Sequence, residues 1–501
     1  MRCLYLTQEL APHFTEGGLG QASRALPAAL HRGHGIVHDL FLPYYPRLVR
    51  ERGLRTEPVS ELPSTTVGGV TAQPVVHRLL GTGDGPEVFL LRADEWYDRE
   101  GIYRDGRYVE FTDAAERAAF YGLCGARWAW SSGRAYDLVH GNDWQSGAAL
   151  AHLRARRGTV ASPALLLNIH SAHYWGEFEP ERLSHLGLPE TYAEELALRC
   201  AGRPSLLHLG MLAADAATTG SPGYARELTD DLACTPLAEA LGTLELTGIV
   251  AGVDAGVWDP TARGRSSAPY DSASVEEGKR ANKRALQRRL GLTVDLDMPL
   301  FGVCTRLVDE KGSDLLLEGL RPLLAAGRAQ LVVVGPGDDR YRAALAALVT
   351  AAPDAVHHSP AFDQDLAWQV YAGADFSPMP SRVEPCGLNQ LISMAYGTIP
   401  LTTPVGGLRD TVTDLTADPR RGTGLVIAEH TARAVQDTAE RALRLLAGDR
   451  GHLISLRRRL MTQDWSWDRT ARATAALYTG LAAAVRRPRQ LLTVHFEEQA
   501  S

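Results

Sequence analysis

Residues 381–390 read SRVEPCGLNQ and connect an apolar run to a segment with helical character. The apolar run, residues 374–379, predicts a buried strand, and residues 388–397 predict a helix that a glycine closes. A strand end that meets a helix N-terminus presents free backbone N–H groups, which suit an anionic ligand such as a diphosphate. Glu384 beside them could accept hydrogen bonds from sugar hydroxyls. An ordinary turn with a surface glutamate would show the same pattern.

The composition is that of an ordinary globular protein with more than one domain. The chain has 501 residues, too many for one compact core, and its 45% hydrophobic and 22% charged residues are typical of proteins in water. A formal net charge of −7 argues against a general nucleic-acid binder. The six cysteines form no CxxC pair, which fits reduced thiols and indicates no metal site. Because we see no signal peptide and no apolar run of about 18 residues, we expect a cytoplasmic protein without membrane spans.

The first half opens with the unit that begins a doubly wound α/β domain. Residues 2–8 predict a strand, residues 15–20 (TEGGLG) a glycine turn, and residues 21–32 an amphipathic helix. The turn leaves a space of phosphate size, although glycines also allow a helix to pack closely on a sheet. The next strand, residues 37–43, ends on Pro43 without the acidic residue that holds a ribose in many dinucleotide-binding folds. An NAD-dependent oxidoreductase is therefore a weak interpretation.

Two later strands of the first half end in polar residues. Residues 137–140 lead to Asn142 and Asp143, and residues 164–169 lead to His170. The carboxyl ends of parallel strands form the ligand edge of such a sheet, so these side chains are candidates for a binding site. A histidine at this place is as often structural as functional.

The second half repeats the α/β pattern after a polar stretch. Residues 259–280 are rich in Pro, Ser, Gly, Glu and Arg and predict a linker or surface loop that marks the domain boundary. Residues 300–304 then predict a strand, followed by Arg306 and Lys311 and by a helix over residues 313–324. Two cations five residues apart at a strand–helix junction could clamp a diphosphate. Solvated surface charge explains the pair equally well.

Several segments, taken in order, resemble motifs of the bacterial glycogen and starch synthase family of retaining glycosyltransferases. They are TEGGL at 15–19, NDW at 142–144, IHS at 169–171, TGSPGYAR at 219–226, GVDAGVWDP at 252–260, TRLVDEKGSD at 305–314, EPCGLNQ at 384–390 and YGTIP at 396–400. The resemblance covers most of the chain and implies the α/β GT-B fold, with two facing Rossmann-like domains and a nucleotide sugar in the cleft between them. The expected parts are a first, acceptor-side domain over 1–250, a nucleotide-binding domain over 251–465, a helix over 466–486 that crosses back to the first domain, and a tail over 487–501.

The family suggests a role for each matching residue. The resemblance assigns Arg306 and Lys311 to the departing diphosphate, Glu384 to the hydroxyls of the transferred ring, and His170 to a contact with that ring from the first domain. The donor-binding set is completed by Thr15, Gly17, Gly18, Gly387, Leu388 and Asn389, and the acceptor or ring region by Asn142, Asp143 and Ala251. In retaining enzymes of this kind the acceptor attacks on the face that the leaving group departs from, without a protein nucleophile. The resemblance therefore implies catalysis by charge and positioning, with no metal and no cofactor besides the donor substrate.

Several donor contacts depart from the family pattern. The lysine of the family's glycine loop is Thr15 here, its asparagine near the transferred glucose is Ala251, its histidine before Asp-Trp is Asn142, and the threonine after Cys-Gly-Leu is Asn389. Loss of a phosphate-binding lysine removes charge-assisted hydrogen bonds to the usual donor. Because the cation pair and the glutamate remain, these changes favour an active enzyme with a changed substrate.

The first hypothesis is pseudo-glycosyl transfer to a small molecule. A nucleotide-activated unsaturated cyclitol of the valienol type would be coupled to an amino sugar through a C–N bond, as in the glycogen-synthase-like enzymes of acarbose (acarviosyl) biosynthesis. An allylic cation resembles an oxocarbenium ion, so a clamp built for one could serve the other. The alternative is an ordinary α-1,4-glucan synthase that uses ADP-glucose or UDP-glucose.

A third interpretation is an inactive protein that binds nucleotide sugars or glucan as a regulator, and the retained clamp argues against it. The expected partners are a nucleotide-activated donor and a small-molecule or glucan acceptor, rather than nucleic acid or a membrane. The nucleotide base and the oligomeric state are left open by the sequence, which is compatible with a homo-oligomer.

Overall fold

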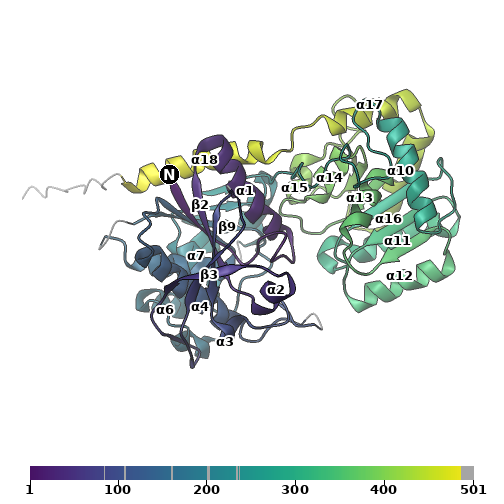
Figure 1. Cartoon of the computed structure of the whole chain (residues 1–501). Coiled ribbons are helices and arrows are strands. Elements are labelled where there is room, and N and C mark those ends of the chain that lie inside the picture. The colour runs from purple at the N-terminus through teal and green to yellow at the C-terminus, as the bar shows by residue number, and fades with distance from the viewer. Residues whose placement is uncertain are drawn as a thin grey trace, which may run out of the picture.

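The computed structural model describes residues 1–83, 85–106, 109–158, 162–199, 203–232, 235 and 237–486. These residues form two α/β domains that lie side by side (Figure 1). The expected tail, residues 487–501, lies outside the described residues. In the described part of the chain, no helix has both the length and the apolar character that a membrane crossing needs.

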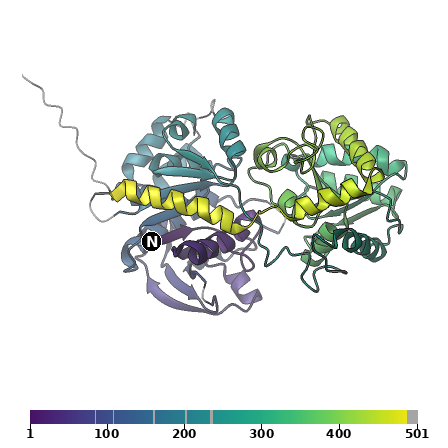
Figure 2. The same ribbon diagram turned by 90° about the horizontal axis from the view of Figure 1, so that it is seen from above.

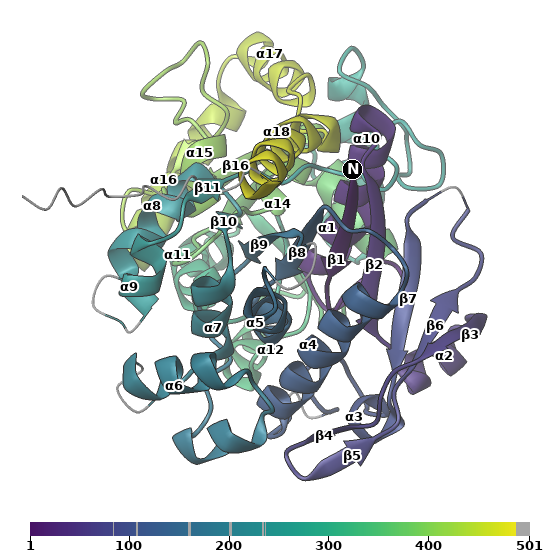
Figure 3. The ribbon, with the colours of Figure 1, turned by 90° about the vertical axis from the view of Figure 1, so that its left-hand side faces the viewer.

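The first domain is built on a sheet whose described strands are ordered β11-β10-β9-β8-β1-β2-β7-β6-β3 (Figure 3). They are β1 (Arg2–Leu6), β2 (Val37–Pro43), β3 (Thr56–Glu61), β6 (Val75–Leu79), β7 (Glu87–Arg92), β8 (Leu138–Asn142), β9 (Ala164–Ile169), β10 (Ala216–Thr219) and β11 (Leu246–Gly248). The sheet is parallel from β11 to β7, and β6 and β3 extend it in the antiparallel sense. A separate hairpin consists of β4 (Thr65–Val67) and β5 (Val70–Ala72).

Helices cover both faces of this sheet, which explains why its central strands are continuous apolar runs. The helices are α1 (Gly18–His34), α2 (Pro46–Glu51), α3 (Asp94–Tyr97), α4 (Ala114–Ser131), α5 (Gly147–Ala155), α6 (Glu190–Arg199), α7 (Leu206–Ala213), α8 (Pro222–Asp231) and α9 (Leu237–Gly242), with 3-10 turns η1 (Trp144–Ser146) and η2 (Pro180–His185). Helices α4, α5 and α7 lie on one face, and α1 lies on the other (Figure 3).

The second domain repeats the design with a fully parallel sheet in the order β14-β13-β12-β15-β16-β17. Its strands are β12 (Leu300–Cys304), β13 (Gln330–Val334), β14 (Val356–Ser359), β15 (Phe376–Met379), β16 (Ile399–Thr402) and β17 (Leu425–Val426). Its helices are α10 (Val275–Arg289), α11 (Ser313–Ala325), α12 (Asp339–Ala351), α13 (Gln364–Gly373), α14 (Asn389–Ala395), α15 (Gly406–Thr411), α16 (Ala432–Ala447) and α17 (Arg450–Met461), with the 3-10 turn η3 (Asp309–Lys311). The expected fold class, two Rossmann-like α/β domains, is therefore confirmed.

The last described helix, α18 (Trp467–Arg486), belongs to the first domain although it follows the second in sequence (Figure 2). It packs on α1, and its apolar face joins the core of the first domain through Trp467, Ala471, Ala475 and Tyr478. The Tyr478 hydroxyl lies 2.5 Å from Nδ1 of His140 in β8. Where the chain crosses over, the Val253 N–H donates to the Trp465 carbonyl at 2.7 Å.

The linker or surface loop expected over residues 259–280 ends earlier than predicted. Residues 275–280, which the composition assigns to a linker, are the first turns of α10. The helix is stabilised by contacts that composition does not reveal, because its two lysines, Lys279 and Lys283, are buried while its arginines stay at or near the surface. Lys279 Nζ donates to the Tyr371 carbonyl at 3.2 Å and to the Thr398 hydroxyl at 2.6 Å, and both lysines of the helix are 2% exposed. A polar segment therefore forms part of the domain interior.

A buried ion cluster holds the second domain together at this face. Asp375, which is 4% exposed, accepts from Lys283 Nζ at 2.6 Å and from Arg457 Nη2 at 2.8 Å. The cluster joins α10, the start of β15 and α17 around one carboxylate. Burial opposes the ionised form of Asp375, but the two cations outweigh burial and hold the pKa of this carboxyl below its usual value.

We predict that Asp375→Ala destabilises the second domain by about 3–5 kcal/mol, because it leaves two buried cations without their counter-ion. Since the folded-state pKa is lowered, the stabilisation is complete above the ordinary Asp pKa of about 3.9 and declines as the pH falls below it. Urea denaturation of both proteins between pH 3 and pH 7 checks this. Asp437→Ala, which removes an exposed partner of Arg433, is the control and should cost about 0.5 kcal/mol or less. Equal effects of the two substitutions would contradict the prediction.

Candidate active site between the two domains

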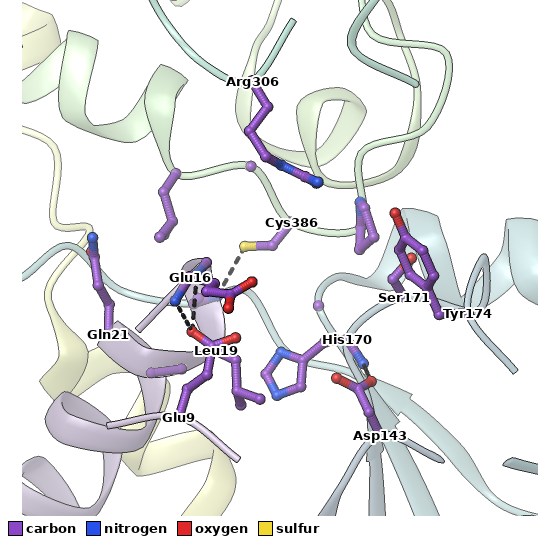
Figure 4. A pocket seen from close by; sticks show the side chains of 18 of the residues that line it. Glu9, Glu16, Leu19, Gln21, Asp143, His170, Ser171, Tyr174, Arg306 and Cys386 are labelled. Atoms are coloured by element: carbon purple, nitrogen blue, oxygen red, sulfur yellow. Dashed lines mark hydrogen bonds between the residues drawn. The ribbon is translucent and has the colours of Figure 1, made fainter. Parts of the chain in front are cut away.

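A cleft of about 840 Å³ separates the two domains, and both contribute its lining. It lies where the carboxyl ends of parallel strands from the two sheets face each other, at β8, β9 and β10 on one side and at β12, β13 and β15 on the other. Figure 4 shows Arg306 and Cys386 reaching into it from the second domain, opposite Glu9, Asp143 and His170 of the first. The volume is that of a typical small-molecule site.

The glycine loop before α1 is held by a carboxylate of the chain itself. Glu9 Oε2 accepts from the backbone N–H groups of Glu16 at 2.8 Å and Gly17 at 2.9 Å (Figure 4), and Glu9 Oε1 accepts from the Tyr103 hydroxyl at 3.0 Å. Gly17 and Gly18 line the cleft. Two amides of the loop therefore already have an anionic partner.

Thr15 is an exposed residue of this loop and is not among the residues that line the cleft. Its hydroxyl lies 3.4 Å from Glu9 Oε2, and a Cβ at Gly20 would collide with it. The Glu16 carboxylate accepts from the Ile102 N–H at 2.9 Å, and burial raises the pKa of this carboxyl. Position 15 therefore acts in the structure of the loop and brings no charge to the cleft.

Asp143 fixes the place of His170 at the end of β9. The Asp143 backbone has φ of 52°, a left-handed conformation that is costly for a residue other than glycine. Its carboxylate Oδ1 accepts from the His170 N–H at 2.7 Å, and its own N–H donates to the Asn168 carbonyl at 2.8 Å. Burial raises the pKa of the Asp143 carboxyl above its usual value. Asp143 and His170 both line the cleft, whereas Asn142 is buried beneath the histidine ring.

The structure brings Arg306, Lys311 and Glu384 together on the second domain. Arg306 follows β12 and Lys311 ends η3, while Glu384 follows β15, the strand next to β12. Lys311 Nζ donates to both carboxylate oxygens of Glu384, at 2.9 and 2.7 Å, and the Ser381 hydroxyl donates to one of them at 3.2 Å. All three predicted residues line the cleft. Opposite charges thus meet where two strand ends converge.

Gly387, Leu388 and Asn389 form the turn into α14 and also line the cleft. Gly387 has φ of 72°, and a Cβ there would collide with the Gln390 side chain, so this position requires glycine. The Asn389 amide donates to the Cys304 carbonyl at 2.7 Å and ties the turn to the end of β12.

Cys386 contacts the first-domain side of the cleft. Its sulfur accepts from the Ala251 N–H at 3.3 Å, and burial raises the pKa of the Cys386 thiol to about 12. Ala251 lies in the wall of the cleft as well. The two positions meet where the chain passes from one domain to the other.

Several residues that line the cleft are not predicted from the sequence, among them Glu9, Glu310, Tyr174 and Phe362. Glu310 Oε1 accepts from the Tyr174 hydroxyl at 3.2 Å, a hydrogen bond that crosses between the domains, and Glu310 Oε2 lies 3.9 Å from Arg306 Nη2. Phe362, after β14, is 56% exposed and lines the cleft. Tyr174 lies in the polar segment after residues 164–169, so its position beyond a strand end is a signal that could have marked it. Among the described residues, no three His, Cys, Asp or Glu side chains gather in a way that could hold a metal ion.

Comparisons with known proteins point to one family. Residues 2–242 match the family model of the starch synthase catalytic domain, and residues 291–455 match that of the glycosyl transferases group 1. A glycogen synthase of Rhodospirillum rubrum is 35% identical over 97% of this chain and 100% of its own length, and one of Anaeromyxobacter dehalogenans is 37% identical over 96% and 100%. The solved catalytic domain of Arabidopsis thaliana starch synthase IV, bound to ADP and acarbose, superposes with a TM-score of 0.86 at 25% identity and covers 96% of this chain and 99% of that one.

These relatives contradict the hypothesis that the chain couples a cyclitol to an amino sugar. The relatives at 35–37% identity reported above are named glycogen synthases and match over their full length, so they support the alternative of a glucan synthase. The four departures that suggest a changed substrate also have local structural partners, as Thr15 and Asn389 show. The chain is a glycosyltransferase enzyme, and it belongs to the glycogen and starch synthase family of GT-B glycosyltransferases.

Proposed function

We propose that the chain is a glycogen synthase that transfers glucose from a nucleotide diphosphate to the end of an α-1,4-glucan, with retention of configuration. The relatives named glycogen synthase support the reaction. The observation that carries the proposal is the order of groups along the carboxyl edge of the second sheet.

That edge carries an aromatic ring, then cations, then a carboxylate. The strand order β14, β13, β12, β15 places Phe362 beyond the first strand, Pro336 beyond the second, Arg306 beyond the third and Glu384 beyond the fourth. Neighbouring strands lie about 4.8 Å apart, so the row spans roughly 14 Å. A nucleotide sugar has the same sequence of parts, with a base that stacks on aromatic rings, a diphosphate that binds cations, and a sugar whose hydroxyls bind a carboxylate.

The chemistry follows from where charge develops. As the bond between the anomeric carbon and the diphosphate oxygen breaks, negative charge grows on the diphosphate, and Arg306 and Lys311 stabilise it. The acceptor hydroxyl bonds to the anomeric carbon on the face that the diphosphate leaves, and its proton passes to a phosphate oxygen. Glu384 and His170 hold the ring from the two domains, so positioning supplies much of the rate. The nucleotide sugar is a substrate, and the reaction needs no further cofactor.

The direct test uses purified enzyme, glycogen and radiolabelled ADP-glucose or UDP-glucose. We expect transfer of label to glycogen, with release of the nucleoside diphosphate in equal amount. Digestion by an enzyme specific for α-1,4 links should then release the label. No transfer from either donor, by protein that still binds ADP or UDP in calorimetry, would overturn the proposal.

We predict that Arg306→Ala and Lys311→Ala each lower kcat by at least about 100-fold, because each removes a cation aimed at the leaving diphosphate. Steady-state kinetics with the preferred donor measures the loss. Arg433→Ala is the matched control, since Arg433 is an exposed arginine of α16 that pairs only locally with Asp437 among the described residues. Wild-type turnover in Arg306→Ala or Lys311→Ala would refute the assignment of these two cations to the diphosphate.

We also predict that Phe362→Ala raises KM for the donor by about 5- to 150-fold while kcat changes little. Loss of a stacking partner costs about 1–3 kcal/mol per base, and the base lies away from the bond that breaks. Phe362→Trp, which keeps a stacking surface, should retain a KM near that of the wild type. If the alanine variant kept its KM, the nucleobase would have to lie elsewhere in the cleft.

A further inference from the structure

His170 is held at two points, by Asn142, the last residue of β8, and by Asp143, the residue after it. Asp143 binds its backbone N–H, as described above, and Asn142 binds its ring, with Asn142 Oδ1 2.9 Å from His170 Nε2. A second amide approaches the same ring nitrogen, because Asn168 Nδ2 also lies 2.9 Å from His170 Nε2. One nitrogen of the imidazole therefore faces two amide groups of the sheet.

The orientation of each amide is set by its other partners. Asn142 Nδ2 donates to the Leu6 carbonyl at 2.8 Å, so its oxygen must face the histidine, and the Tyr5 hydroxyl donates to that oxygen at 3.3 Å. Asn168 Oδ1 accepts from the Thr218 hydroxyl at 3.1 Å, which turns its NH₂ group toward the ring. The ring nitrogen thus meets a fixed acceptor and a fixed donor at equal distance.

The opposite nitrogen of the ring is the one that a ligand can reach. His170 lines the cleft, and its Nδ1 has no hydrogen-bond partner among the described residues. Asn142 is 1% exposed and is not part of the lining, so it touches a ligand only through His170.

We propose that Asn142 is a positioning residue. Together with Asn168, it holds the His170 ring in place in both neutral tautomers, so that Nδ1 can form a hydrogen bond to a sugar hydroxyl either as acceptor or as donor. When Nε2 carries the proton it donates to Asn142, and Nδ1 faces the cleft as an acceptor. When Nε2 is bare it accepts from Asn168, and Nδ1–H faces the cleft as a donor. The ring keeps one position in both forms, so it can accept from or donate to the hydroxyl that it contacts without moving. This inference rests on the proposed contact of His170 with the transferred ring.

The experiment is a double-mutant cycle of Asn142→Ala and His170→Ala, measured as kcat and KM with donor and glycogen. We expect Asn142→Ala to lower kcat by about 10- to 100-fold with KM within about threefold, because a misplaced ring acts on the transition state. The double variant should be no slower than His170→Ala, since Asn142 acts only through the ring. Losses that multiply in the double variant would overturn the inference. A His170→Ala enzyme with normal kcat would instead remove the proposed role of His170 in the reaction.

A spectroscopic readout keeps the test valid if the alanine variant folds poorly. Asn142→Asp has nearly the same shape but presents only acceptor oxygens, so it should hold Nε2 protonated. In protein labelled with ¹⁵N-histidine, the His170 signals, assigned by their loss in His170→Gln, should show both neutral tautomers in the wild type. In Asn142→Asp the signal of the form with an unprotonated Nε2 should be lost, because a carboxylate cannot donate to that nitrogen. Identical tautomer signals in the two proteins would contradict the inference whatever the kinetics.

Discussion

The ion pair between Lys311 and Glu384 is the interaction around which the second domain's half of the cleft is arranged. Both partners are largely withdrawn from water, which costs free energy unless the geometry is good and other hydrogen bonds complete it. The geometry here is good, since the ammonium bonds both carboxylate oxygens and Ser381 adds a third donor. The pair joins the loop after β12 to the loop after β15, so the groups for phosphate and for sugar share one rigid support.

The first domain reaches this support at several points of close backbone approach. The Ser221 hydroxyl donates to the Pro385 carbonyl at 2.7 Å, and a Cβ at Gly220 would lie 2.9 Å from the same oxygen. On the other side, the Gly406 N–H donates to both oxygens of Glu227, at 2.8 and 2.9 Å. The loop that carries Glu384 is therefore fastened to both domains, and its position depends on their relative placement.

Much of the fold could be predicted because its central strands are apolar runs bounded by turn residues. Residues 37–43, 164–169 and 300–304 agree with β2, β9 and β12 to the residue. The first turns of α10 could not be predicted, since lysine and arginine in sequence indicate solvent, whereas here Lys279 lies inside. Tertiary hydrogen bonds to distant carbonyls decide that burial, and no local pattern records them.

The candidate site was predictable to the extent that its residues follow strand ends. The placement of Arg306, Lys311, Glu384 and His170 in one cleft follows from that rule and from the facing sheets. Contacts between segments far apart in the chain could not be foreseen, such as Tyr174 with Glu310 across 136 positions. The error about the substrate has a related cause. The changed-substrate hypothesis assumes that position 15 contacts the donor. The Thr15 side chain instead contacts Glu9 and lies next to Gly20, and it does not line the cleft.

Because α18 returns to the first domain, that domain cannot be completed until almost the whole chain has been synthesised. His140 and Tyr478, which are in contact in the finished protein, are 338 positions apart. At about 5–20 residues per second, a ribosome needs roughly 17 to 70 s between them. During that time the apolar side chains of α1 and of the strands beneath it, among them Leu26, Leu30 and Leu138, lack the helix that covers them. The first domain is thus synthesised first but completed last. Its uncovered apolar face is open to contact with other chains while the second domain is being synthesised.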